Sequence, residues 1–299
     1  MRAHHYLLPT MPTNDQLLDL ALQYRTQGFV HLENLVPPAL LARARRAFDA
    51  AAVAHAAATD GARAAGSRYV DLPAILDADP AFVDLVDLPQ LLPLLRAVVG
   101  ESIALQETSA RLFFPGPTFT SPYHSDIARV CGIAQQHCPG FLAKVHFYLE
   151  DLAPDQGCLS FIPGSQHLPP LHVDPHRRTL AGSGATVRIV PRAGDVVLFN
   201  THVLHMAEAN GTARVRKSII YTYGHFWMKA CASAAPRDPA RFAADPVRSQ
   251  LFGIAQPGVG HFGRRLDRLE APGPVARLRK LAAKAARRVL AAEEPAPRA

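Results

Sequence analysis

The residues with the most chemical content are His124 and Asp126, separated by one residue, and the more distant His205. On an extended segment, His124 and Asp126 point to the same side of the chain. Two imidazoles and one carboxylate can occupy one face of an octahedral ferrous ion and leave three positions open to other ligands. The alternative is a His–Asp hydrogen bond in a surface loop. The second histidine far downstream favours a metal site.

Arg216 lies 11 residues after His205, at the start of a segment that the sequence predicts to be a strand, residues 216–226. A buried arginine is costly unless it is paired, and its planar guanidinium binds a carboxylate through two hydrogen bonds. Ser218 shares the strand face of Arg216 and can donate a further hydrogen bond. Arg214 has the same parity but lies closer to a turn, where a solvated arginine is the ordinary interpretation. We therefore expect Arg216 to bind an anionic co-substrate.

Two further stretches lie between and beside these residues. Residues 157–165 read Gly-Cys-Leu-Ser-Phe-Ile-Pro-Gly-Ser, and residues 194–200 read Gly-Asp-Val-Val-Leu-Phe-Asn. With these motifs the chain resembles the phytanoyl-CoA dioxygenase family, a branch of the iron(II)- and 2-oxoglutarate-dependent oxygenases, over roughly residues 15–227. It departs from the family in two places. Gln156 stands where the family commonly has Asn, and Gln166-His167 stands where the family has a His directly after Pro-Gly-Ser. Neither change touches the candidate metal ligands.

The resemblance implies a function and a set of roles. Its iron ligands would be His124, Asp126 and His205, and Arg216 with Ser218 would bind 2-oxoglutarate, the co-substrate that is used with O2. The family spacing to Arg216 favours His205 over its neighbour His202, which would be a packed imidazole. Hydroxylation of an aliphatic C–H bond in a small molecule is the default outcome, although desaturation, cyclisation and epimerisation use the same ligands.

His146 is a further candidate for a contact with the co-substrate. Strand alternation places Lys144, His146 and Tyr148 on one face, and the resemblance puts a co-substrate contact at the position of His146. A core histidine is an equally good interpretation. Weaker candidates for substrate contacts, each of which can equally be a packing or surface residue, are Gln106, Tyr123, Arg129, His225 and Trp227.

Composition excludes several classes of protein. The chain has 299 residues and is 48% hydrophobic, which fits a protein with a sizeable core. The sequence shows neither an apolar run of membrane-spanning length nor a signal pattern, so we expect a cytoplasmic protein without integral membrane association. The net charge of +7 is concentrated in residues 264–288, so it does not indicate nucleic-acid binding. The oligomeric state is left open.

The predicted organisation is a mainly β protein with flanking helices, whose core is a double-stranded β-helix (a cupin-like jelly roll). A single oxygenase domain would span residues 1–270, with a helical part at about 13–100, the jelly roll at about 103–227 and an irregular extension at 228–270. Residues 271–299 would form a basic amphipathic helix and tail. The predicted helices are residues 14–27, 37–58 and 88–99, and residues 59–67 are expected to be a surface loop. The predicted strands are residues 29–32, 103–114, 143–150, 158–162, 187–190, 195–199 and 216–226.

A rival hypothesis from another class is a catalytically silent jelly-roll protein that binds a small anion or sugar. A cupin-type isomerase or thiol dioxygenase is a third, but such sites typically use three or four histidines. The intact ligand set with Arg216 favours the oxygenase. The Ala-, Arg- and Pro-rich composition is typical of a high-GC bacterial genome, which favours a role in natural-product biosynthesis.

Overall fold

The protein is described by a computed structural model at residues 5–7, 11–117, 122–126, 141–168 and 186–254. Within these residues the chain forms two β-sheets. The larger sheet has the strand order β1 (His5–Leu7), β2 (Phe29–Glu33), β8 (Val196–Asn200), β5 (Leu142–Tyr148), β10 (Arg216–His225), β4 (Ile103–Phe113) and β3 (Tyr69–Leu72). The smaller sheet has the order β7 (Val187–Ile189), β6 (Leu159–Phe161) and β9 (His205–Ala207). Every pair except β1–β2 is antiparallel. The predicted jelly-roll core is confirmed.

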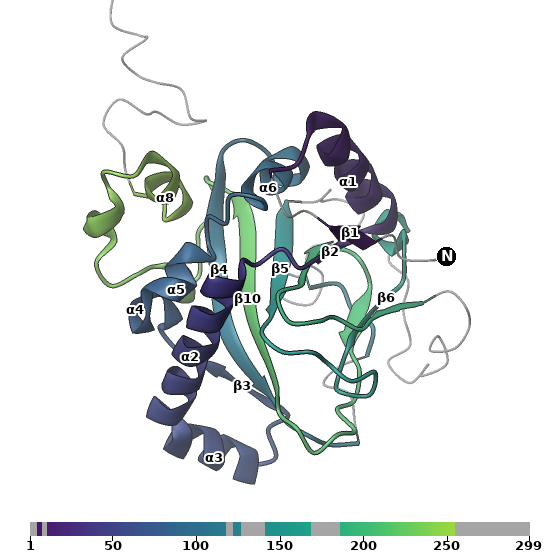
Figure 1. Ribbon diagram of the computed structural model, residues 1–299, viewed down its shortest axis with the longest axis vertical. Coiled ribbons are helices and arrows are strands. Elements are labelled where there is room, and N and C mark those ends of the chain that lie inside the picture. Colours follow the sequence, from purple (N-terminus) through teal and green to yellow (C-terminus); the bar gives the residue numbers. More distant parts are fainter. Residues whose placement is uncertain (1–4, 8–10, 118–121, 127–140, 169–185, 255–299) are drawn as a thin grey trace, which may run out of the picture. The chain divides into compact units, whose positions relative to one another are not determined.

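The larger sheet has an apolar core on each of its faces, because alternate residues of a strand point to opposite sides. On one face, side chains such as Val145, Phe147 and Ile219 pack against the helices. On the other face, Tyr148 and Phe199 form a second core together with residues of the smaller sheet. Figure 1 shows this layering, with helices on one side of β4 and β10 and β6 on the other. We call the second side the metal-facing side, because the ring of His205, a predicted metal ligand, lies there against Phe199, with 4.7 Å between ring centroids.

The helices of the first core are α1 (Asn14–Gln27), α2 (Pro38–Ala54), α4 (Ile75–Ala78), α5 (Pro80–Asp84) and α6 (Leu92–Val99). The start of α1 is fixed by a capping box, in which the Thr13 and Gln16 side chains each bond the other's backbone N–H. Gly28 ends α1 with a φ of 89°, and a Cβ at this position would lie 2.6 Å from the Val203 side chain. Glycine therefore allows the tight turn into β2.

The prediction for residues 37–67 was wrong in part. The expected helix to residue 58 ends at Ala54, and a second helix, α3 (Ala56–Ala64), occupies most of the expected loop. Five alanines in α3 outweigh its single glycine, because alanine has the highest helix propensity. The short elements α4, α5, β3 and β9 were not predicted, since segments of three to five residues carry too little periodicity to be recognised.

Residues after β10 form short helices. They are η4 (Ala232–Ala234), η5 (Pro239–Phe242) and α8 (Pro246–Leu251). Arg248 of α8 fixes this segment to the helical layer through bonds to Asp84 and Asp87. No helix in the described part of the chain is long and apolar enough to cross a membrane. The predicted basic helix at 271–299 lies outside the described residues.

Candidate active site

His124, Asp126 and His205 lie together and form a group that can hold a metal ion, since their ligand atoms are all within 4.8 Å of one another. His124 and Asp126 lie in the segment of residues 122–126, and His205 begins β9. The two backbones form a β-bridge, with the N–H of each histidine donating to the carbonyl of the other at 3.0 Å. Asp126 lies opposite both rings, at 3.4 Å from His124 Nε2 and 3.6 Å from His205 Nε2.

The backbone sets which nitrogen of each ring can bind a metal. His124 Nδ1 lies 2.9 Å from the Pro122 carbonyl oxygen, and His205 Nδ1 lies 2.9 Å from the Val203 carbonyl oxygen. A carbonyl only accepts, so Nδ1–H is the donor in both rings and Nε2 keeps its lone pair facing Asp126. Burial lowers the pKa of His205 to about 4, which favours the neutral imidazole that metals require.

Asp126 stays ionised in this site and has an additional partner, Lys144. Burial opposes ionisation, yet the surrounding basic groups, above all the ammonium of Lys144, hold the pKa of Asp126 well below its usual value. Lys144 Nζ lies 2.8 Å from Asp126 Oδ2. Sequence reasoning placed Lys144 on the face of His146 but gave it no role. Only its strand parity could have suggested one.

Arg216 is the largest fully buried side chain near this group, and it is 1% exposed. It donates to the Gly157 carbonyl oxygen, and its guanidinium carbon lies 4.9 Å from the centre of the Phe113 ring. Within the described residues its Nε has no hydrogen-bond partner and no carboxylate pairs with it. Burial lowers the pKa of Arg216, but a guanidinium remains charged. A buried cation without an acidic partner is suited to an anionic ligand.

The strand register places three more polar side chains beside Arg216. Ser218 pairs with Tyr148, and Ile220 pairs with His146, so these residues share the metal-facing side of β10 and β5. Ser218 Oγ, Tyr148 hydroxyl and His146 Nδ1 are all buried without a hydrogen-bond partner in the described residues. Burial, aided by the charge of Arg216, holds the pKa of His146 well below its usual value. These orphaned atoms form a row that fits a ligand with carboxylates.

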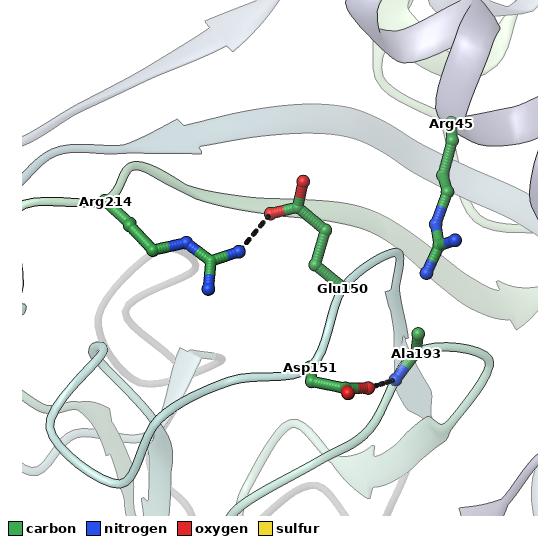
Figure 2. Close-up of a pocket in the computed structure, with 5 residues that line it drawn as sticks. All are labelled: Arg45, Glu150, Asp151, Ala193 and Arg214. Atoms are coloured by element: carbon green, nitrogen blue, oxygen red, sulfur yellow. Dashed lines mark hydrogen bonds and ion pairs between the residues drawn. The ribbon is translucent and has the colours of Figure 1, made fainter.

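The two rival residues lie elsewhere. His202 is buried and bonds Asn200, with its N–H donating to the amide oxygen at 2.9 Å, and it is not part of the metal-binding group. Arg214 lies 3.9 Å from Glu150, and its side chain is 65% exposed. Figure 2 shows it in a charged surface pocket of about 490 Å³ that Arg45, Asp151 and Ala193 also line. No candidate metal ligand lines that pocket.

The weaker substrate candidates are scattered. Tyr123 bonds Ser160 on β6 at 2.7 Å, and Gln106 donates to the His225 carbonyl oxygen at 3.2 Å. The His225 ring stacks on Trp227 with 5.5 Å between centroids. A Cβ on Gly100, directly after α6, would lie 3.3 Å from the His225 ring, so this ring lies next to the end of α6. Arg129 lies outside the described residues.

Comparison with known proteins then identifies the family. The model of the phytanoyl-CoA dioxygenase family (PhyH) matches residues 24–218, more than half of the chain. The chain belongs to this family. It is an iron(II)- and 2-oxoglutarate-dependent oxygenase, an oxidoreductase that uses O2, and the His–Asp–His group and the row of orphaned polar atoms fit that metal and co-substrate. A search of curated proteins found no match.

Solved structures share the fold at low sequence identity. The epimerase SnoN, in complex with Fe3+, alpha ketoglutarate and nogalamycin RO, is 21% identical, with a TM-score of 0.52 over 85% of this chain and 94% of SnoN. HygX from Streptomyces hygroscopicus, with nickel, 2-oxoglutarate and hygromycin B bound, is 19% identical, with a TM-score of 0.53 over 73% of this chain and 90% of HygX. The carbocyclase SnoK from nogalamycin biosynthesis is 21% identical, with a TM-score of 0.50 over 72% of this chain and 87% of SnoK.

Proposed function

We propose that this oxygenase oxidises an aliphatic C–H bond of a small molecule in natural-product biosynthesis, with hydroxylation as the outcome. The observation that carries the proposal is an intact His–Asp–His group together with a buried arginine that no acidic residue pairs with in the described part of the chain. A protein that only binds a ligand needs no such combination. The solved structures that share the fold include proteins with nogalamycin RO or hygromycin B bound, which supports a natural product as the substrate.

The proposed residue roles follow from the contacts. His124, Asp126 and His205 would hold the iron, with the histidine rings fixed by their Nδ1–H bonds to backbone carbonyls. When bound, iron together with 2-oxoglutarate and O2 supplies the oxidising chemistry that breaks the C–H bond. Lys144 would keep Asp126 oriented through its ion pair.

Four residues would bind the co-substrate. Arg216 and Ser218 are buried side by side on one strand face and would bind the distal carboxylate of 2-oxoglutarate. The Tyr148 hydroxyl lies in the next strand opposite Ser218 and would donate to the same group. His146 lies one position along this row from Tyr148, and we propose that its neutral ring contacts the co-substrate.

Hydroxylation is one of several outcomes that this ligand set supports. An epimerase and a carbocyclase are among the proteins of the same fold, so the reaction depends on how the substrate is held. The choice is open to direct test by mass spectrometry of the product. Gain of one oxygen atom indicates hydroxylation, loss of two hydrogens indicates desaturation or ring closure, and an unchanged mass indicates epimerisation.

The experiment that tests the proposal is anaerobic addition of Fe(II) and 2-oxoglutarate. We expect a weak visible charge-transfer band, which His205→Ala should abolish because it removes one metal ligand. His202→Ala is the matched control, since it removes a buried imidazole three residues before His205 that is not part of the metal-binding group. A band that survives in the His205 variant and disappears in the His202 variant would show that the ligand assignment is wrong. No band in the unmodified protein would contradict the proposed function.

A further inference from the structure

The strand β4 contains a bulge on the metal-facing side. Glu107 pairs with Thr222 of β10, but the next paired residue is Leu105, so Gln106 is an extra residue in β4. Leu105 belongs to the core on the helix side. The Gln106 side chain lies 3.0 Å from where a Cβ would stand on Gly224, and Glu107 accepts a hydrogen bond from Thr222 Oγ1 at 3.2 Å. The bulge therefore turns two consecutive polar side chains to the same side.

This bulge is connected to the metal-binding group by one row of paired residues. Glu107 pairs with Thr222, and Thr222 pairs with Lys144 of β5. Lys144 in turn contacts Asp126. Neighbouring strands are about 4.8 Å apart, so the backbone of Glu107 lies roughly 10 Å from that of Lys144. This separation of the two backbones is within the length of a small molecule whose reacting end is at the metal.

Among the described residues, the cations on this side of the sheet form their ion pairs with carboxylates other than Glu107. Arg111 binds Asp71 through two hydrogen bonds of 2.7 Å, and Lys144 is paired with Asp126. Glu107 is exposed, and among the described residues no cation lies within ion-pairing distance of it. The Thr222 hydroxyl orients one of its oxygens. The open end of the row thus carries a negative charge that the protein orients, and among the described residues Arg111, which is bound to Asp71, acts on it only at longer range than an ion pair.

We propose that Glu107, oriented by Thr222 and by the bulge at Gln106, binds a protonated amine of the substrate. The substrate class is then an amine-bearing small molecule in which the amine lies roughly 10 Å from the metal-proximal end. This inference rests on the proposed function, because it takes the metal-proximal end as the reacting end. A charge-assisted hydrogen bond to the amine provides selectivity over an uncharged analogue of the same shape.

Matched probes that differ only in the charge of the amine test this subsite. Protein loaded with Ni(II) and 2-oxoglutarate is dialysed to equilibrium against chitobiose and N,N′-diacetylchitobiose, tyramine and N-acetyltyramine, and spermidine and its triacetyl derivative. Retained compounds are measured by mass spectrometry. We expect the amine of at least one pair to be retained about tenfold or more over its acetylated partner, as a charged hydrogen bond implies. Glu107→Gln should remove this preference, and Glu107→Lys should reverse it.

Controls separate the subsite from the rest of the proposal. Glu101→Gln changes a glutamate whose side chain is 87% exposed at the end of α6, and it should keep the amine preference. Melting temperature verifies that each variant is folded. Equal retention of both members of every pair, or a preference that persists in Glu107→Gln, would overturn the subsite. Because 2-oxoglutarate binding is measured separately in each protein, its loss in the unmodified chain would instead contradict the proposed function.

Discussion

The two faces of the larger sheet satisfy their tyrosines in different ways. On the helix side, Tyr221 and Tyr223 of β10 donate to the carbonyl oxygens of Phe82 and Val86 at 2.7 and 2.8 Å. On the metal-facing side, the equally buried Tyr148 has no hydrogen-bond partner in the described residues. The faces belong to the same sheet, so the difference reflects what each face packs against. The helix side contacts protein, and the metal-facing side has polar atoms arranged for a ligand.

Alternate residues of a strand point to opposite faces, so this contrast assigns side chains on the helix side to folding and side chains on the metal-facing side to ligand binding. A buried polar atom without a partner costs free energy, and folded proteins contain few of them. Arg216, Ser218, Tyr148 and His146 all contribute such atoms, and all lie on the metal-facing side. Substitutions on the helix side should therefore reduce stability, whereas substitutions on the metal-facing side should reduce affinity for 2-oxoglutarate.

The largest expected effect is that of Arg216→Ala. Removing one partner of a buried, charge-assisted pair typically costs about 2–5 kcal/mol. The dissociation constant for 2-oxoglutarate should therefore rise by roughly 30-fold or more. Iron binding without the co-substrate should change little, because Arg216 is not part of the metal-binding group. Both constants can be measured by anaerobic titration.

Arg214→Ala is the matched control for Arg216. Both arginines have the same strand parity, but Arg214 is exposed and faces Glu150 in the surface pocket of Figure 2. Exposed ion pairs contribute little, so this variant should behave as the unmodified protein does. Arg216→Lys should recover only part of the affinity, since an ammonium lacks the planar fork of a guanidinium. Equal effects of Arg214→Ala and Arg216→Ala would contradict the assignment of the anion site.

The next prediction compares two tyrosines that are both fully buried. Tyr221→Phe should lower the free energy of unfolding by about 1–3 kcal/mol, because the Phe82 carbonyl oxygen loses its donor. Tyr148→Phe loses no hydrogen bond within the described residues, so stability without ligand should not fall. Its affinity for 2-oxoglutarate should instead fall by several-fold. Chemical denaturation and co-substrate titration of both variants measure the two effects.

The tyrosine pair can also disprove the contrast between the faces. If Tyr148→Phe destabilises the ligand-free protein as much as Tyr221→Phe does, then the Tyr148 hydroxyl has a partner in the folded chain. The metal-facing side would in that case be an ordinary core. If Tyr221→Phe changes co-substrate affinity while Tyr148→Phe does not, the register on which the assignment of faces depends would be wrong.

Sequence patterns predicted much of this arrangement, but not its cross-strand details. Alternation correctly placed Lys144, His146 and Tyr148 on one face, because the two-residue period of a strand is local. The bulge at Gln106 depends on how β4 pairs with β10, which no local pattern specifies. The contact between Lys144 and Asp126 likewise arises only when their two segments come together in the folded chain. Both features depend on pairing between distant segments, which local sequence patterns do not specify.

The same limit applies to the helical part. The predicted bounds of α1 agree with the structure, in which a capping box at Thr13 and an αL glycine at Gly28 lie within a few residues of the helix ends. In α3, the glycine and the small polar residues suggested a loop, and alanine propensity in fact continued the helix. A local signal is reliable when it specifies a hydrogen bond, as a cap does, and is weaker when it only reflects average composition.

The smallest expected effect concerns pH and His146. Its pKa in the folded protein lies well below the unfolded value of about 6.5, because burial and the charge of Arg216 disfavour the protonated ring. Below about pH 6.5 the unfolded chain takes up a proton at this residue while the folded chain does not. Protons therefore favour unfolding, and stability should fall with decreasing pH by up to about 1.4 kcal/mol per pH unit from this residue.

His146→Gln should remove this contribution. Denaturation of the ligand-free protein between about pH 7 and about pH 5, a range that includes the unfolded-state pKa of histidine, measures it. The pH slope of the variant should be shallower than that of the unmodified protein by about one proton. His55→Gln, which changes a histidine at the junction of α2 and α3, should keep the full slope. Identical slopes for His146→Gln and the unmodified protein would mean that His146 is already protonated, or accessible to protons, in the folded state. Its proposed role as a neutral contact for the co-substrate would then fail, while the roles of Arg216 and Ser218 would stand.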